Sequence, residues 1–289
     1  MLLVNCISMT KTGLFIVVFF LFSCVGNQQA LKIKGSDTEV NLVVKLAEEF
    51  HTINKDAYVS ISGGGSGLGI ASLINGQTDI ANSSRELNET EKELFTRKGI
   101  AIDTFVFAED AIAFIVSPDL PLDSICIEEL SKILDGTYQN WNKLCGKNMK
   151  INIYGRQSNS GTFDFVKNKL NIQFSENAKE MNGNAQIIEA IKADESGIGY
   201  VGAGYVLGSR IGNKTPVKVL KIGKTKTSPS YSALDPEAVF SHVYYFRRHL
   251  FQYILTSSSD NAAAFIDFEK SPQGAAIIQA SGYYPLKKH

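Results

Sequence analysis

Apolar residues along the chain switch repeatedly between two spacings, and a short polar loop stands at each switch. In the first unit, residues 31–34 have the pattern of a short strand, residues 35–38 form a loop of Gly, Ser, Asp and Thr, and apolar positions then recur at helical spacing to about residue 52. Asp37 or Thr38 is the predicted N-cap of this helix. Strands that alternate with helices predict an α/β fold with parallel strands.

The same unit recurs three times along the chain. The predicted strand, loop and helix are residues 57–62, 63–69 and 70–74 in the second unit, 80–81, 82–85 and 89–98 in the third, and 151–154, 156–162 and 163–170 in the fourth. Two apolar runs, residues 101–107 and 110–116, lead to Pro118 and Pro121, which predict a crossing to a second lobe. Residues 239–255 fit a strand or a second crossing, and residues 260–268 and 272–280 fit two closing helices.

The loop at residues 156–162 has the chemistry of an anion site. A helix that begins at Gly161 or Thr162 leaves its first backbone N–H groups without partners in the helix, and these groups point at the loop. The hydroxyls of Ser160 and Thr162 would add donors, and Arg156 would add a planar fork for two oxyanion oxygens. A Ser/Asn-rich turn with a surface arginine is the alternative. Three similar loops elsewhere in the chain favour the anion site.

The glycine run at residues 63–69 excludes several better-known sites. It lacks the Gly-Lys-Ser/Thr ending of a nucleotide phosphate loop, and no register gives the dinucleotide fingerprint. Ser66 is not a hydrolase elbow, because Leu68 stands where that motif needs glycine. An anion smaller than a nucleotide remains. The recurring loops predict two α/β lobes that face each other across a cleft with the anion between them.

Composition limits the partners of the protein. Its 289 residues allow one large or two ordinary domains, and 29 basic and 29 acidic side chains give no net charge that would attract nucleic acid or an anionic membrane. The four histidines are scattered, and no Cys/His cluster predicts a metal. Cys126 and Cys145, which follow the N-terminal segment, fit either a disulfide or two buried free thiols.

The N-terminus has the pattern of an export signal. Lys11 precedes an apolar run that is too short to span a bilayer, and residues 21–24 resemble the lipobox of bacterial lipoproteins. A degraded transmembrane anchor is the alternative. Cleavage before Cys24 and acylation of its thiol would hold the mature chain at a membrane's outer face. We therefore predict a signal peptide at residues 1–23 and a tether at residues 24–30.

Six segments in this order resemble the phosphate-binding protein of bacterial phosphate-specific ABC transporters, in the shorter branch of that family. They are residues 35–38 (GSDT), 63–67 (GGGSG), 79–85 (DIANSSR), 156–162 (RQSNSGT), 197–200 (GIGY) and 282–286 (GYYPL). The resemblance implies a type II periplasmic binding protein fold with a two-strand hinge. The predicted lobes are residues 31–115 with 246–289 and residues 116–245.

The resemblance also implies a set of phosphate-binding residues. They are Ser36, Thr38, the N–H of Glu39, Ser66, Ser84, Arg85, Arg156, Ser160, Gly161 and Thr162. Ser84 stands where longer family members have an aspartate that accepts the proton of hydrogen phosphate, which weakens the basis for rejecting sulfate. The family's usual segment at the second crossing is replaced around Arg247 and Arg248, which we predict to be a solvated pair.

The predicted function is therefore transport rather than catalysis. We expect a monomeric, lipid-anchored receptor on the periplasmic side that binds inorganic phosphate without cofactor or metal and delivers it to the permease of an ABC transporter. Alternatives are a receptor for sulfate, molybdate or tungstate, a hydrolase with Ser66 or Ser160 as nucleophile, or a surface adhesin on the same fold. The hydrolase has no histidine in any of the four loops.

Overall fold

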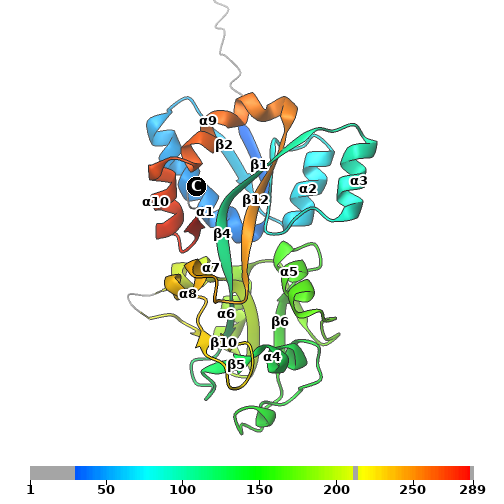
Figure 1. The fold of residues 1–289 in the computed structure, drawn as a ribbon, viewed down its shortest axis with the longest axis vertical. Coiled ribbons are helices and arrows are strands. Elements are labelled where there is room, and N and C mark those ends of the chain that lie inside the picture. The colour runs from blue at the N-terminus through cyan, green and yellow to red at the C-terminus, as the bar shows by residue number, and fades with distance from the viewer. Residues whose placement is uncertain (1–29, 211–213, 287–289) are drawn as a thin grey trace, which may run out of the picture.

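The computed structural model describes residues 30–210 and 214–286. The predicted signal peptide, Cys24 and nearly all of the tether lie outside the described residues. Two lobes lie one above the other in Figure 1, and two long strands, β4 (Ile102–Val116) and β12 (Arg247–Leu255), run from one into the other. We call the lobe with the N-terminal elements lobe I and the other lobe II.

Lobe I contains three of the predicted strand-loop-helix units. They are β1 (Leu31–Gly35) with α1 (Asp37–Ile53), β2 (Val59–Ser62) with α2 (Ser66–Ile74), and β3 (Ile80–Ser83) with α3 (Glu89–Arg97). The strands pair in parallel in the order β2-β1-β3. The three units and the α/β fold are confirmed. Parallel pairing brings the three strand ends, and the loops that follow them, to one edge of the sheet.

Strand β4 joins two apolar runs and corrects one prediction. The runs at residues 101–107 and 110–116 fall in one continuous strand. Its first part pairs with β12 up to Ala111, and from Ile112 onward it pairs with β8 (Gly197–Gly202) of lobe II. The chain therefore changes lobes inside the strand, and the crossing predicted at Pro118 and Pro121 is wrong. One extended strand can join the two lobes because its first half pairs with β12 and its second half pairs with β8.

Lobe II extends the same sheet and adds a small second one. Its elements are β5 (Ser124–Cys126), α4 (Ile127–Leu134), η1 (Trp141–Lys143), β6 (Asn152–Arg156), α5 (Gly161–Leu170), β7 (Lys179–Met181), α6 (Asn184–Ala193), α7 (Ala203–Gly208), β9 (Lys218–Val219), β10 (Lys221–Gly223), β11 (Ser230–Tyr231) and α8 (Pro236–Phe240). The main sheet runs β2-β1-β3-β12-β4-β8-β6-β7. The fourth predicted unit is confirmed as β6 and α5.

The C-terminal segment returns to lobe I. After β12 and η2 (Thr256–Ser258) come α9 (Ser259–Glu269), α10 (Pro272–Ala280) and β13 (Tyr284–Pro285). The two helices match the predicted closing helices, and their apolar residues join those of α1 in the core of lobe I. Because β12 lies between β3 and β4, this late segment completes the middle of the lobe I sheet.

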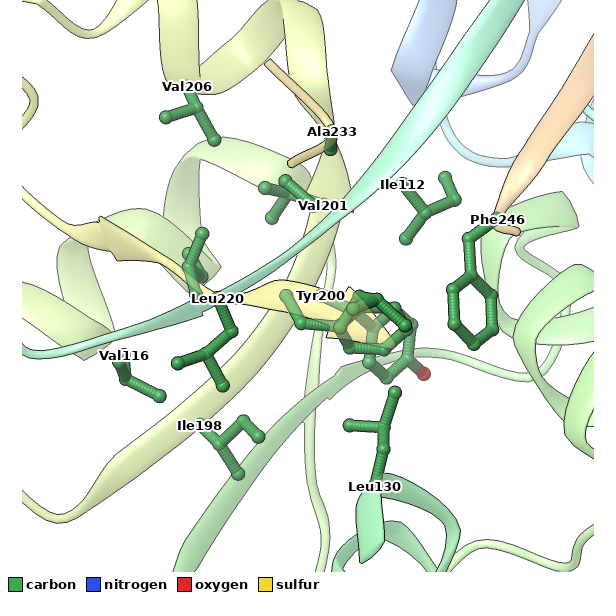
Figure 2. Close-up of a cluster of buried hydrophobic side chains, with 14 of the residues drawn as sticks. Ile112, Val116, Leu130, Ile198, Tyr200, Val201, Val206, Leu220, Ala233 and Phe246 are labelled. Atoms are coloured by element: carbon green, nitrogen blue, oxygen red, sulfur yellow. The ribbon is translucent and has the colours of Figure 1, made fainter. Parts of the chain in front are cut away.

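Each lobe has its own apolar core. The lobe II cluster shown in Figure 2 includes Tyr200, Phe246 and Ile112, and Ile112 belongs to the part of β4 that pairs with β8. The predicted lobe bounds at 115/116 and 245/246 stay predictions, while the strand partners change between Ala111 and Ile112.

Two further features concern the described residues as a whole. Cys126 and Cys145 are both free, which resolves that alternative in favour of thiols. In residues 30–210 and 214–286, no helix is long and apolar enough to cross a membrane, and no three His, Cys, Asp or Glu side chains group as metal ligands.

Candidate anion-binding site

Hydroxyl groups from all four predicted loops meet where the lobes face each other. Thr38 Oγ1 of lobe I lies 3.1 Å from Thr162 Oγ1 of lobe II. Ser36 Oγ donates to Ser84 Oγ at 3.1 Å, and Ser66 Oγ lies 3.4 Å from Ser84 Oγ. All five side chains are buried. The structure therefore brings together loops that lie up to 124 residues apart in the sequence, as the cleft prediction requires.

Two glycines allow the loops to come this close. Gly35 ends β1 with a positive φ of 143°, and a Cβ there would collide with the carbonyl of Asn82. A Cβ on Gly161, the first residue of α5, would collide with the hydroxyls of Ser66 and Ser84. Side chains at either position would force the helix starts apart. The backbone N–H groups at these starts can therefore approach a small guest directly.

The helix caps differ between the two lobes. Ser36, and not Asp37 or Thr38, is the N-cap of α1, and its side chain makes no capping hydrogen bond. Ser160 caps α5 as its Oγ accepts from the N–H of Thr162 at 3.2 Å. The two predicted caps of α1 lie one and two residues too late, because the strand ends at Gly35 and the helix begins at Asp37.

Arg156 is a buried cation with incomplete pairing. Its side chain is 1% exposed, and its Nη2 donates to the Asn182 carbonyl at 3.1 Å. Nη1 lies 3.4 Å from Asp37 Oδ2 but makes no hydrogen bond. Burial lowers the pKa of Arg156, and the nearby Asp37 carboxylate opposes this shift. A buried guanidinium with a free N–H is costly to maintain, and an anion bound at Nη1 would remove that cost.

Arg248 lies at the hydroxyl cluster, although the sequence analysis did not place it there. It is 6% exposed, so the prediction of a solvated pair is wrong for it. Its Nη2 donates to Thr38 Oγ1 at 3.2 Å and to Thr162 Oγ1 at 3.1 Å. Nε and Nη2 also donate to Asp110 Oδ2, at 3.2 and 2.9 Å. Asp110 was the available signal, because a lone carboxylate inside an apolar strand needs a cation partner.

Arg85 lies at the edge of the cleft and forms ion pairs with Glu91 and Asp164. Nη1 and Nη2 donate to the two Glu91 oxygens at 2.7 and 2.8 Å. Nε lies 2.8 Å from Oδ2 of Asp164 on α5, so this ion pair joins the lobes. A cavity of about 410 Å³ opens beside it and reaches Ser84 and Arg248. The predicted role of Arg85 in phosphate binding stays a prediction.

Other contacts hold the lobes against each other. The Asp37 carboxylate accepts from the backbone N–H and the side-chain amide of Asn184, at 2.9 and 2.8 Å. Tyr205 donates its hydroxyl to the Asp37 carbonyl at 2.6 Å. The N–H of Gly67 donates to the Asn159 carbonyl at 3.0 Å. The cleft is therefore nearly closed around the hydroxyl cluster.

The side chain of Glu39 has an unexpected environment. The sequence analysis predicts a role for its N–H, which here donates to the Ser36 carbonyl at 3.1 Å. Its carboxyl is 0% exposed, and neither oxygen has a hydrogen-bond partner. Burial raises the pKa of Glu39 well above its ordinary value, and the neighbouring Ser36 hydroxyl and Arg248 only partly oppose this. Among the described residues, no hydrogen bond links Ser66 or Ser160 to a histidine.

Comparison with known proteins identifies the family. Residues 25–272 match the model of the PBP superfamily domain. The phosphate-binding protein PstS of Bacillus subtilis is 31% identical over 91% of this chain and 84% of that protein, and PstS of Borreliella burgdorferi is 29% identical over 92% and 94%.

Solved structures agree. A phosphate ABC transporter substrate-binding protein from Clostridium perfringens with bound phosphate shares the fold, with a TM-score of 0.79 at 24% identity over 90% of this chain and all of that one. PstS from Borrelia burgdorferi gives a TM-score of 0.56 at 30% identity over 90% and 100%. The chain therefore belongs to the PBP superfamily, and within it to the family of the phosphate-binding protein PstS.

Proposed function

We propose that this protein binds inorganic phosphate between its lobes and delivers it to the permease of an ABC transporter. The proposal rests chiefly on Nη1 of Arg156. This buried guanidinium nitrogen has no hydrogen-bond partner and lies among hydroxyls and helix starts. A small oxyanion supplies the missing acceptor and can accept from the hydroxyls and amides around it. The names of the PstS relatives support phosphate as that oxyanion.

The proposed contacts come from both lobes. We infer that phosphate is held by Ser36, Thr38, the N–H of Glu39, Ser66, Ser84, Arg156, Ser160, Gly161 and Thr162, with Arg248 added and Arg85 at the entrance. Ser84 Oγ can accept the proton of hydrogen phosphate, since a hydroxyl both donates and accepts. The proposed function is binding and delivery, without a chemical step.

Titration of the mature protein with phosphate tests the proposal. Isothermal titration calorimetry should show saturable phosphate binding, and sulfate, molybdate and tungstate should compete more weakly. Equal affinity for sulfate would reject the phosphate assignment and favour a general oxyanion receptor. Absence of saturable phosphate binding would reject the function itself.

Arg156→Ala tests the carrying observation. It should weaken phosphate binding by at least about 1.5 kcal/mol, which is more than tenfold, because it removes a charge-assisted donor from a buried site. Arg97→Ala is the matched control, since Arg97 is exposed at the end of α3. Unchanged affinity in Arg156→Ala would show that the guanidinium does not contact the ligand.

We further propose that the mature chain is a monomer anchored by lipid on Cys24 at the periplasmic side of a membrane. Cys24 lies outside the described residues, so the support is the sequence pattern at residues 21–24. Mass spectrometry of the membrane-associated chain should find an acylated Cys24 as its first residue, and Cys24→Ser should release the protein from the membrane. An N-terminus at another residue would contradict the anchor.

A further inference from the structure

Glu39 combines a position in the anion site with a buried, unpartnered carboxyl. It is the third residue of α1 and follows Thr38, whose hydroxyl faces lobe II. The Ser36 hydroxyl is close enough to influence Glu39 but donates to Ser84 Oγ instead, at 3.1 Å. Both oxygens of Glu39 therefore remain without a donor. A fully buried carboxylate in this state would carry a large desolvation cost, and a proton removes most of it.

The surroundings of Glu39 contain several more acceptors without donors. Asn82 Oδ1, Gln252 Oε1 and Glu269 Oε2 are buried and lack hydrogen-bond partners. Asn82 and Gln252 face each other across β3 and β12, and Gln252 Nε2 donates to Glu269 Oε1 at 3.1 Å. Oxygens that lack donors favour neutral acids, because a protonated carboxyl supplies a donor that a carboxylate does not.

The charges around Glu39 point the same way. Arg248 on β12 favours an ionised Glu39, whereas Asp110 on β4 and Glu269 on α9 oppose it. The hydroxyls of Ser36, Tyr205 and Tyr283 are also near Glu39. Arg248 is already paired with Asp110, at 2.9 Å.

The remaining cation of the site is also paired. Arg156 Nη1 lies 3.4 Å from Asp37 Oδ2. The two cations and their two acids therefore balance, and an ionised Glu39 would make the site net negative before any anion enters. That charge would repel an oxyanion through a medium of low dielectric constant.

We propose that phosphate binds to the form of the protein in which the Glu39 carboxyl is neutral, so that binding takes up a proton wherever Glu39 is ionised in the ligand-free protein. This inference rests on the proposed function. Glu39 acts here as a positioning residue that sets the charge of the site, in addition to the contact proposed for its N–H. Burial raises the pKa of Glu39 and so favours the neutral form of its side chain.

The proposal gives phosphate affinity a specific pH dependence. Below the pKa that Glu39 has in the ligand-free protein, the acid is already neutral and affinity should not depend on its titration. Above that pKa, the Glu39 carboxylate must take up a proton from solvent when phosphate binds. Phosphate affinity should therefore fall by up to tenfold per pH unit. By linkage, bound phosphate raises the proton affinity of Glu39 by the same factor.

Calorimetry in matched buffers measures the proton directly. Phosphate is titrated into the full mature protein from about pH 7 to pH 9.5, in pairs of phosphate-free buffers that differ in ionisation enthalpy. The wild-type heats should diverge between buffers at the alkaline end, approaching one proton taken up per phosphate. Phosphate itself is almost wholly a dianion there and contributes little to the proton count.

Variants assign the proton to a residue. Glu39→Gln is neutral at every pH and should bind phosphate without proton uptake and with a flat pH profile. Glu48→Gln, an exposed glutamate on the same helix, is the matched control and should behave as the wild type. If Glu39→Gln fails to fold, Glu39→Met, which is neutral and of similar volume, replaces it.

The outcomes separate this inference from the proposed function. Uptake that persists in Glu39→Gln overturns the inference and leaves phosphate binding intact. Wild-type binding without proton uptake also overturns it if Glu39→Gln loses affinity, because a neutral side chain is then not the form that binds. Uptake lost in Glu269→Gln instead would move the proton to Glu269 and also overturn it. No saturable phosphate binding by the wild type would reject the proposed function.

Discussion

The two lobes differ in what they bury. The interior of lobe II is largely apolar and its polar groups are paired: Trp141 Nε1 donates to the Ser196 carbonyl at 2.9 Å, and Tyr244 donates to the Ile112 carbonyl at 2.5 Å. Among the described residues of that lobe, only Arg156 has a buried side-chain N or O without a partner. Among its described residues, lobe I has buried atoms that lack a hydrogen bond in six side chains, those of Glu39, Asn82, Arg85, Asp110, Gln252 and Glu269. Of these, Arg85 Nε still has an ion-pair partner in Asp164, at 2.8 Å.

The difference separates two tasks of one site. Lobe II provides a fixed cation on a well-packed frame, so its face of the cleft has the same charge over the accessible pH range. Lobe I provides hydroxyls backed by acids whose protonation can change. A buried acid lowers stability when it ionises, so lobe I should lose stability as pH rises while lobe II should not.

The largest effect is expected in the core of lobe II. Phe114 is fully buried and packs against Phe246 with ring centroids 4.7 Å apart. Phe114→Ala should reduce the free energy of unfolding of this lobe by about 4 kcal/mol, through lost burial and the cavity left behind. Urea unfolding followed by fluorescence of Trp141, the only tryptophan, reports on lobe II. The loss of unfolding free energy should be equal at pH 5 and pH 8. A loss that depends on pH would contradict the expectation that only lobe I changes stability with pH.

The next effect concerns Glu269 in lobe I. Burial raises its pKa from 4.5 to about 8, so the folded chain holds a proton that the unfolded chain has released in this range. The stabilisation is complete below pH 4.5 and is lost as pH rises toward 8. Glu269→Gln should therefore gain stability over the wild type with rising pH, by about 3.5 kcal/mol between pH 5 and pH 8. Unfolding by circular dichroism at pH 5 and pH 8 measures the difference, with Glu48→Gln as control. A constant difference would mean that Glu269 stays ionised.

The smallest effect is expected where the lobes touch. The Arg85–Asp164 pair joins them at 2.8 Å but is partly exposed, so it contributes only about 0.5 to 1 kcal/mol and is screened by salt. Asp164→Asn should weaken phosphate binding a few-fold at low salt and leave it nearly unchanged at high salt. Asp123→Asn removes an exposed pair with Lys218 within lobe II and should have no such effect. Equal losses of phosphate affinity in the two variants would show that the Arg85–Asp164 pair does not support binding by joining the lobes.

The sequence predicted the loops of the site better than the strands between the lobes. Each loop lies where the spacing of apolar residues changes from that of a strand to that of a helix, so its position could be predicted from the sequence. The expectation of parallel strands then placed the loops at one edge of the sheet. The continuity of β4 could not be predicted, because Ala108 and Glu109 interrupt the apolar pattern. In the structure Glu109 stays within the strand and forms an ion pair with Arg247, at 2.9 Å.

Arg248 could not be placed from the sequence for a related reason. Its burial depends on β12 being inserted between β3 and β4, which aligns Arg248 with Asp110 across the strands. Local pattern carries no information about a contact between residues 138 positions apart. The same holds for Glu39, because helical spacing shows the face that it occupies but not the Gln252 and Glu269 side chains that share that interior.

The central position of β12 also bears on the order in which the chain can fold. A polypeptide made from its N-terminus presents β1 to β4 and then the whole of lobe II before β12 exists, so lobe II can fold while lobe I still lacks its middle strand. Closing the long connection between β4 and β12 is a slow, non-local step. Until it occurs, the loops of Thr38, Ser84 and Thr162 lack the Arg248 guanidinium that donates hydrogen bonds to them. The receptor can therefore gain its ligand affinity only when nearly all of its residues have been synthesised.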